Sequence, residues 1–334
     1  MKRILLWTVG VLLAAVVIAL IAFRASPWPA AWVIATLWGR EGERLSTALA
    51  RHVPSNVSSR RDLAYGPGED ERFDLHRPAQ TDVALPTIVW IHGGGYVSGS
   101  KEAVANYLRI LASHGFTVVG IGYSIGPGHA YPKPVVQANA ALGYLSTHAS
   151  ALGIDPRALV LAGDSAGAQI AAQVAMLTTD PRYATEIGIA PTLDRAQVRG
   201  TILGSGVFDF TRFRYDGPGA LFTNTFLRAY SGRRHFLDDE RFMRGSITPN
   251  LSAAFPPSFV TSGNADPLEG QAHRLVERLA ERGIDHESLF FPPDHEPAQP
   301  HVYFFDLDSD EGRRALSSMV AFARRQVDAA PAAP

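Results

Sequence analysis

Short apolar runs alternate with longer amphipathic stretches along most of this chain, and glycine or proline bounds many of them. The apolar runs lie at 87–91, 116–121, 158–162, 198–203, 258–261 and 288–291. Amphipathic patterns with helical spacing lie at 101–114, 135–148, 166–178, 268–282 and 311–327. Wholly apolar strands separated by helices are typical of a mostly parallel sheet with both faces covered. We therefore expect a doubly wound α/β fold over residues 61–328.

Two segments depart from this alternation. Residues 62–66 and 71–77 alternate polar and apolar positions around a Gly-Pro-Gly turn, which predicts a hairpin at the edge of the sheet. Residues 207–255 contain ten of the 32 aromatic residues (17 Phe, 10 Tyr and 5 Trp), about twice their share by length. We expect this segment to be an inserted helical cap over an apolar pocket, with most of its rings forming the core of the cap.

The N-terminal pattern is different, because residues 4–23 contain no charge at all. As a helix this run would span about 30 Å, enough to cross a bilayer. Residues 1–24 are therefore predicted to be a transmembrane anchor, with a cleaved signal sequence as the alternative. Lys2 and Arg3 precede the run and Arg24 closes it, which favours an extracytoplasmic (periplasmic) location for the body of the chain, or secretion after cleavage.

Residues 25–60 are predicted to form juxtamembrane or N-terminal cap helices. Trp28, Trp32 and Trp38 lie in an apolar stretch that is too short to be a second span. These rings suit either a membrane interface or a first helix packed on the body of the protein. The alanine-rich and proline-rich end, residues 329–334, is predicted to be a disordered tail.

Composition narrows the possible chemistry. The 334 residues carry 31 Lys and Arg against 32 Asp and Glu, and no cysteine. The net charge of −1 provides no basic surplus for nucleic-acid binding. Without cysteine there is no disulfide, no thiolate metal site and no thiol nucleophile, so covalent catalysis would need another nucleophile such as a hydroxyl group.

A candidate hydroxyl is Ser165, in the sequence Gly-Asp-Ser-Ala-Gly at 163–167. This G-x-S-x-G motif directly follows a predicted strand and directly precedes a predicted helix, which is the context that a nucleophile elbow requires. A sharp turn there would raise the Ser165 hydroxyl above the ends of the strands. The amides at the start of the following helix would favour negative charge beside it.

A second motif, His92-Gly-Gly-Gly-Tyr96, follows the strand predicted at 87–91. Glycines allow backbone amides to point into a site, where they can stabilise the oxyanion that forms when an ester carbonyl is attacked. Phosphate binding is the alternative, but neither glycine-rich phosphate pattern is present. We interpret His92 as a structural side chain of this loop.

Together the two motifs resemble those of α/β-hydrolases in the bacterial hormone-sensitive-lipase-like esterase group. The resemblance extends over about 62–327 and implies an α/β-hydrolase fold and ester hydrolysis without a cofactor. It also implies that the amides of Gly94 and Gly95 belong to the oxyanion hole, with Gly93 as a further candidate donor. We expect the amide of Ala166 to complete the hole. Residues 121–134 depart from the pattern of this group, which leaves the substrate preference open.

The remaining catalytic groups should follow in the order acid, then histidine. Asp266 comes after the strand predicted at 258–261 and is the expected acid, with Glu269 and Asp209 as alternatives. His301 is the expected base, because an apolar run follows it, whereas His295 lies among polar residues. The prolines between these two histidines prevent a helical His-Glu-x-x-His site, so no metal is expected.

Ser98 and Lys101 match S-x-x-K, but the partner motifs S-D-N and K-T-G are absent, so we place Lys101 in the first turn of a helix. The sequence thus predicts a serine carboxylic-ester hydrolase that acts on short- to medium-chain acyl esters through an acyl-enzyme. Alternatives are an amidase, arylformamidase or thioesterase with the same triad, and a non-catalytic membrane-tethered binding domain. The sequence does not assign an oligomeric state.

Overall fold

The structure is a computed structural model that describes residues 2–217 and 219–329. In this part of the chain eight strands form one sheet in the order β1-β2-β4-β3-β5-β6-β7-β8. β2 is antiparallel to β1 and β4, and all the other pairs are parallel. The strands are β1 (Val57–Ala64), β2 (Arg72–Pro78), β3 (Leu85–Ile91), β4 (Thr117–Ile121), β5 (Ile154–Asp164), β6 (Val198–Gly204), β7 (Ser258–Thr261) and β8 (His286–Leu289).

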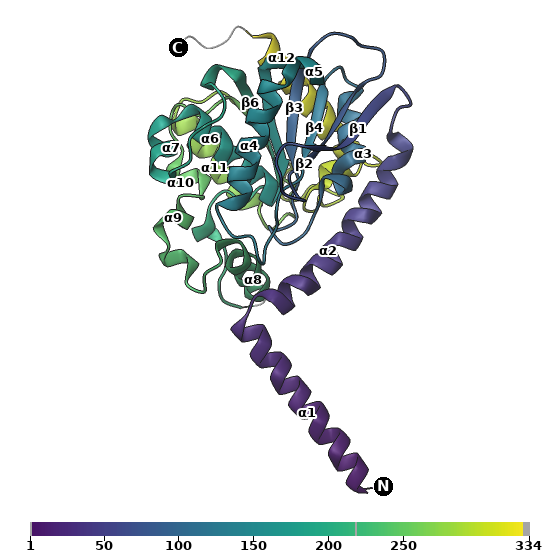
Figure 1. The fold of residues 1–334 in the computed structure, drawn as a ribbon, viewed down its shortest axis with the longest axis vertical. Coiled ribbons are helices and arrows are strands. Elements are labelled where there is room, and N and C mark those ends of the chain that lie inside the picture. The colour runs from purple at the N-terminus through teal and green to yellow at the C-terminus, as the bar shows by residue number, and fades with distance from the viewer. Residues whose placement is uncertain (1, 218, 330–334) are drawn as a thin grey trace.

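Helices cover both faces of this sheet (Figure 1). In chain order they are α1 (Lys2–Ala25), α2 (Trp28–Leu49), α3 (Lys101–Ala112), α4 (Lys133–Thr147), α5 (Ala149–Leu152), α6 (Ala166–Thr179), α7 (Pro181–Ile187), α8 (Ala220–Ser231), α9 (Glu240–Met243), α10 (Ile247–Asn250), α11 (Glu269–Glu281) and α12 (Asp310–Asp328). Side chains alternate between the two faces of a strand, so β3 contributes to two cores. Ile88 and Trp90 pack with α3 and α12, whereas Val89 and Ile91 pack with α4, α6 and α11.

The α/β prediction is confirmed, including the edge hairpin of β1 and β2. The last strand was predicted two residues too late, because β8 ends at Leu289. Phe290 and Phe291 leave the sheet for ring contacts, with His273 at 4.1 Å and with Tyr303 at 5.1 Å between ring centroids. An apolar run therefore marked the place of the strand but not its limits.

α1 extends away from the body of the protein, as Figure 1 shows. Over the residues that the structure describes, we find no helix that is both long and apolar enough to cross a membrane. The transmembrane anchor predicted over 1–24 is therefore not confirmed. The extracytoplasmic location stays a prediction. Of the predicted tail, 330–334 lie outside the described residues.

The segment predicted as a cap contains α8, α9 and α10, and its described residues, 207–217 and 219–255, add no strand to the sheet. Seven of its ten rings are buried, as expected for rings that form a core. Phe210 stacks on Phe242 at 4.7 Å, and Tyr230 stacks on Tyr96 from the predicted oxyanion loop at 3.7 Å. These contacts join the segment to the loop that follows β3.

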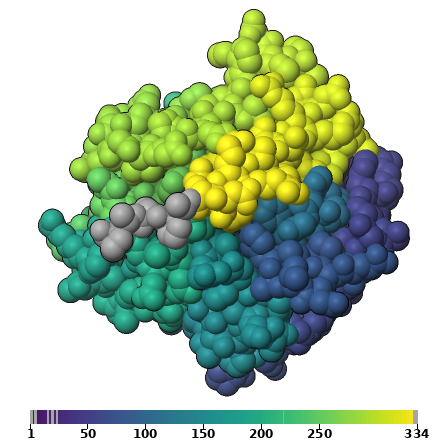
Figure 2. Space-filling model, turned by 90° about the horizontal axis from the view of Figure 1, so that it is seen from above, coloured from purple at the N-terminus to yellow at the C-terminus, as the bar shows by residue number. Residues whose placement is uncertain are grey.

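Figure 2 looks onto the end of the molecule opposite α1. It shows α12 in yellow, between blue segments from the first third of the chain and green segments from the last third. Phe322 of α12 packs against Phe259 of β7, with 6.0 Å between the ring centroids. The C-terminal helix therefore covers one face of the sheet, and it packs there against residues that are far from it in the sequence.

Lys101 is the first residue of α3, as expected, but it is buried. Its ammonium group donates to Asp62 at 2.6 Å and to the buried Asp74 at 2.8 Å. The backbone amide of Asp62 also donates to the carboxylate of Asp74. Lys101 therefore ties the β1–β2 hairpin to α3 and neutralises a buried carboxylate, a structural role.

Candidate active site

Ser165 occupies a strained turn between β5 and α6. Its φ of 52° and ψ of −120° are unusual for a residue with a side chain, and such strain persists only where neighbouring structure imposes it. Gly167 shows why: a Cβ there would lie 2.1 Å from the carbonyl oxygen of Ile91 and 2.4 Å from that of His92. The turn can approach the end of β3 this closely only with glycine at 167.

The hydroxyl of Ser165 lies at one end of a hydrogen-bonded chain of three side chains. Its Oγ is 3.0 Å from Nε2 of His301, and Nδ1 of His301 is 3.0 Å from each carboxylate oxygen of Asp266. If Nδ1 carries the proton and donates to Asp266, Nε2 is free to accept from the serine. The structure thus brings together the three residues expected as nucleophile, base and acid.

Asp266 is buried and well satisfied. The amide of Leu268 donates to it at 2.8 Å and the hydroxyl of Ser262 at 2.9 Å. Burial alone would raise the pKa of Asp266, but the hydrogen bond and charge of His301 hold it below its usual value. The carboxylate therefore stays ionised beside the imidazole while it also holds the backbone of Leu268, the residue before α11.

The backbone around His301 is fixed by the neighbouring strand ends. The amide of Val302, at a φ of 54°, donates to the buried hydroxyl of Ser205 at 3.1 Å. The Tyr303 hydroxyl lies 2.6 Å from the hydroxyl of Thr261, the last residue of β7. The apolar run after His301 restricts this loop, as the sequence indicates.

The alternative residues have other partners. His295 Nε2 lies 3.0 Å from Glu311 of α12. Glu269 pairs with His273 one helical turn away at 3.5 Å. Asp209 accepts from the amide and hydroxyl of Thr211. None of these contacts involves Ser165.

The loop after β3 presents backbone amides beside Ser165. Gly94 and Gly95 have φ values of 118° and 58°, which glycine adopts readily. Within the described part of the chain, their amides donate to no protein acceptor. The amide of Ala166 is likewise unpaired there, at the N-terminus of α6. These three groups are therefore available to a ligand oxygen, as expected from the sequence.

Asp164 holds this loop against the elbow. Its buried carboxylate accepts from the amide of Gly93 at 3.0 Å and from the indole of Trp90 at 2.9 Å. Burial raises the pKa of Asp164 to about 6, although both hydrogen bonds act to lower it. The sequence alone predicted no role for Asp164. Its position next to Ser165 in the elbow motif was the one signal that it lies at the site.

His92 is buried within the same loop. Its ring stacks on Tyr123 at 4.3 Å, and Nδ1 lies 2.8 Å from the carbonyl oxygen of Gly93. Burial lowers the pKa of His92 to about 4, so the ring is neutral near pH 7. These contacts agree with a structural interpretation of His92.

Ser165 and His301 line a cavity of about 1690 Å³ between α2, the glycine loop and α8. Trp38 of α2 is part of its wall and lies over the loop, because a Cβ at Gly95 would be 2.5 Å from the indole Cζ3. The sequence alone did not place Trp38 in the site. The buried Ala30, Ala31 and Ile34 have helical spacing, the signal that α2 packs on the body.

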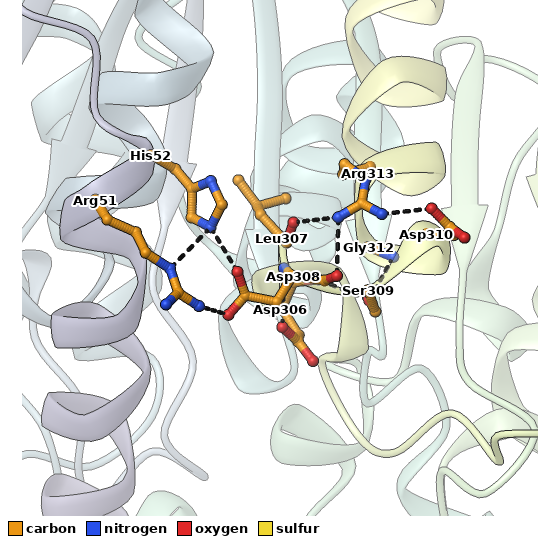
Figure 3. Close-up of polar contacts among 9 residues, drawn as sticks. All are labelled: Arg51, His52, Asp306, Leu307, Asp308, Ser309, Asp310, Gly312 and Arg313. Carbon is orange, nitrogen blue, oxygen red and sulfur yellow. Dashed lines mark hydrogen bonds and ion pairs between the residues drawn. The ribbon is translucent and has the colours of Figure 1, made fainter.

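The short turn that follows α2, residues 50–52, is tied to the loop that follows His301 (Figure 3). Arg51 and His52 both bind the carboxylate of Asp308, His52 at 2.9 Å. Arg313 of α12 donates to the carbonyl oxygens of Leu307 and Asp308, each at 2.8 Å. These contacts fix α2 as a wall of the cavity.

Among the described residues there is no group of three or more His, Asp or Glu that could hold a metal ion. The site has instead a hydroxyl, an imidazole, a carboxylate and unpaired amides around a cavity. This set of groups can carry out acyl transfer.

Comparison with known proteins identifies the family. A family model described as alpha/beta hydrolase fold matches residues 88–303. The chain is 28% identical over 224 residues to "Probable carboxylic ester hydrolase LipM" of Mycobacterium tuberculosis, covering 65% of this chain and about half (51%) of that protein. It is 27% identical over 260 residues to an acetyl esterase of Salmonella paratyphi B, covering 76% of each chain.

Solved structures share the fold. Esterase B from Lactobacillus rhamnosis, inhibited in the crystal, superposes with a TM-score of 0.78 at 22% identity, covering 90% of this chain and 97% of that one. An esterase from Pyrobaculum calidifontis superposes with a TM-score of 0.70 at 23% identity, covering 90% of this chain and 94% of the other. On the family match, the two motifs and this fold, the chain belongs to the α/β-hydrolases, in the hormone-sensitive-lipase-like group of carboxylesterases.

Proposed function

We propose that this protein is a serine carboxylic-ester hydrolase in which Ser165, His301 and Asp266 form the catalytic triad. The observation that carries the proposal is the unbroken chain of hydrogen bonds from the Ser165 hydroxyl through His301 to the buried Asp266. The Ser165 end of this chain of hydrogen bonds faces the cavity, beside the amides of Gly94, Gly95 and Ala166 that have no protein acceptor among the described residues. The relatives named as ester hydrolases support the reaction type.

The reaction proceeds in two steps. Nε2 of His301 takes the proton of Ser165 as Oγ attacks the ester carbonyl, and the amides of Gly94, Gly95 and Ala166 stabilise the oxyanion. The imidazolium, stabilised by Asp266, gives its proton to the departing alcohol and leaves an acyl-enzyme. Water then attacks the acyl-enzyme with His301 again as base, and the acid is released as Ser165 regains its proton.

Ser165→Ala removes the nucleophile without adding bulk at the turn. We expect hydrolysis of p-nitrophenyl butyrate to fall by about three orders of magnitude or more, because the covalent route is lost. The far-UV circular dichroism spectrum should not change. A fluorophosphonate probe should label the wild type at Ser165 and leave the variant unlabelled. An unlabelled wild type would instead support the non-catalytic binding domain.

The two histidines provide a matched pair. His301→Ala should lower kcat by about three orders of magnitude, because among the described residues no other base contacts the serine hydroxyl. His295→Ala removes the contact with Glu311 and a ring contact with Phe291, neither of which involves Ser165, and should change kcat less than about tenfold. Steady-state kinetics of both variants on one ester measure the two kcat values. A larger loss of kcat in His295→Ala than in His301→Ala would assign the base to His295.

We propose short- to medium-chain acyl esters as substrates, supported by the Salmonella relative named acetyl esterase. Rates on p-nitrophenyl esters from C2 to C16 should be highest at or below about C8, since the bulky rings of Trp38, Phe222 and Phe226 line the cavity and leave less room for a long acyl chain. Fastest turnover at C16 would contradict this range. Anilides and thioesters with the best acyl group test the amidase and thioesterase alternatives.

Asp164→Asn tests the positioning of the oxyanion loop. The variant keeps one carbonyl oxygen, so either Gly93 or Trp90 loses its acceptor. With the loop amides displaced, kcat should fall by about tenfold or more, and KM should change little. An unchanged kcat would show that Asp164 does not position the oxyanion loop for the reaction.

The same variant has a pH signature. The pKa of Asp164 is raised from 3.8 to about 6, so the folded protein binds this proton more tightly than the unfolded chain. The stability that the proton provides is present below the unfolded pKa and is lost as pH rises through about 6. From about pH 3 to pH 7, the free energy of unfolding of the wild type should therefore fall by up to about 3 kcal/mol relative to Asp164→Asn. Urea titrations of the wild type and of Asp164→Asn across this pH range measure the difference, and a constant difference would contradict a raised pKa for Asp164.

A further inference from the structure

The outer surface of α2 changes character halfway along the helix. In its first half, large apolar side chains face solvent: Trp28 is 58% exposed, Trp32 70% and Leu37 54%. Residues 25–39 carry no charge, whereas residues 40–44 carry two Arg and two Glu. One helix thus has an apolar exposed half and a charged half.

Two neighbours extend the apolar half of α2. α8 packs against α2 and exposes Leu221 (61%) and Phe222 (49%). α1 joins α2 through Ser26 and Pro27, and Figure 1 shows α1, the start of α2 and α8 meeting at one end of the molecule. Among the α1 side chains that the structure describes, the large apolar ones exposed to solvent include Trp7, Val9, Val11, Leu12, Leu13, Val17, Ile18 and Ile21. We refer to α1, the first half of α2 and the start of α8 as the apolar end.

The apolar end borders the cavity that contains Ser165. Trp38 and Phe222 are exposed at this end and also line the cavity. A surface that covers the apolar end would therefore lie against one rim of the cavity.

We infer that the apolar end rests on a lipid surface, with the cavity rim at the boundary between lipid and water. Tryptophan rings favour the interfacial region of a bilayer. The uncharged first half of α2 suits contact with lipid, and the charged residues that follow it suit contact with water. If the proposed function holds, ester substrates would reach Ser165 from the lipid.

The polar groups of α2 favour lipid over a protein partner. Apart from the tryptophan indoles, Ser26 and Thr36 have the only polar side chains in residues 25–39. Ser26 already accepts from the amide of Trp28, and Thr36 donates to the carbonyl of Trp32. A specific protein interface normally includes direct hydrogen bonds between aligned polar groups, and this face has few groups to form them.

The surface is also held in place. Asn106 of α3 donates to the carbonyl of Ser46 at 2.9 Å, and Arg51 and His52, in the turn just after α2, bind Asp308 (Figure 3). These contacts hold the C-terminal half of α2 in place, and the position of the apolar half is fixed with it.

A fluorescent label can locate the contact, since the chain has no cysteine of its own. We would label Leu37→Cys with an environment-sensitive nitrobenzoxadiazole dye, in the full chain carrying Ser165→Ala. Phosphatidylcholine vesicles should shift its emission to the blue and increase it by about twofold or more. Val83→Cys, 64% exposed in the loop between β2 and β3, is the matched control and should not respond.

Flotation of the vesicles shows whether the labelled protein is bound at all. Bound protein with an unchanged Leu37 label would mean that α1 alone attaches it, and would overturn the proposal, as would protein that does not float. A response without vesicles that grows with protein concentration would assign the surface to a second copy of the chain, and also overturn it. Because the readout involves no turnover, failure of the proposed esterase activity would not affect it.

Activity provides the second test. Trp32→Ser with Leu221→Ser changes exposed residues outside the cavity lining. We expect this double variant to hydrolyse p-nitrophenyl laurate dissolved in phosphatidylcholine vesicles about tenfold more slowly than the otherwise unchanged protein. Hydrolysis of water-soluble p-nitrophenyl acetate should not change, and Val83→Ser should affect neither substrate. Equal losses on both substrates would indicate a structural effect and contradict a lipid-docking role.

Discussion

The close approach of the turn at Ser165 to the end of β3 is the constraint on which the site depends. Only a hydrogen atom fits at position 167, against the carbonyl oxygens of Ile91 and His92. The approach places the glycine loop beside the serine, and Asp164 binds the two segments through Gly93 and Trp90. The cost is a strained Ser165 and a buried carboxylate, both stabilised by the surrounding sheet.

The other two functional groups depend on the order of the strands. β5, β6, β7 and β8 are parallel neighbours, so the segments that follow them emerge at one edge of the sheet. Asp266 follows β7 and His301 follows β8. The contact of His301 with Ser165 thus joins residues 136 positions apart. Side chains at strand ends, such as Thr261 and Ser205, hold the loops that carry them.

α2 has two roles that place different demands on its sequence. Towards the body, Ala30, Ala31 and Ile34 pack tightly and Trp38 covers part of the cavity. On the outside, Trp32 and Leu37 face solvent, which packing on the body does not explain. The turn that follows its C-terminal end binds Asp308 and fixes the helix, so that one side can shape the cavity while the other faces the lipid surface that we propose (Figure 3).

The sequence by itself determined the α/β class, the edge hairpin and the strand–turn–helix around Ser165, because hydrophobic period and the G-x-S-x-G pattern are local properties. It also limited the candidates for the catalytic acid to three carboxylates and for the catalytic base to His301 or His295. Only the tertiary structure decided that His301 rather than His295 reaches Ser165, that Asp164 holds the glycine loop and that Trp38 lines the cavity. Each of these depends on how distant segments meet across the sheet. Such contacts are set by packing of the whole chain, so no local pattern determines them.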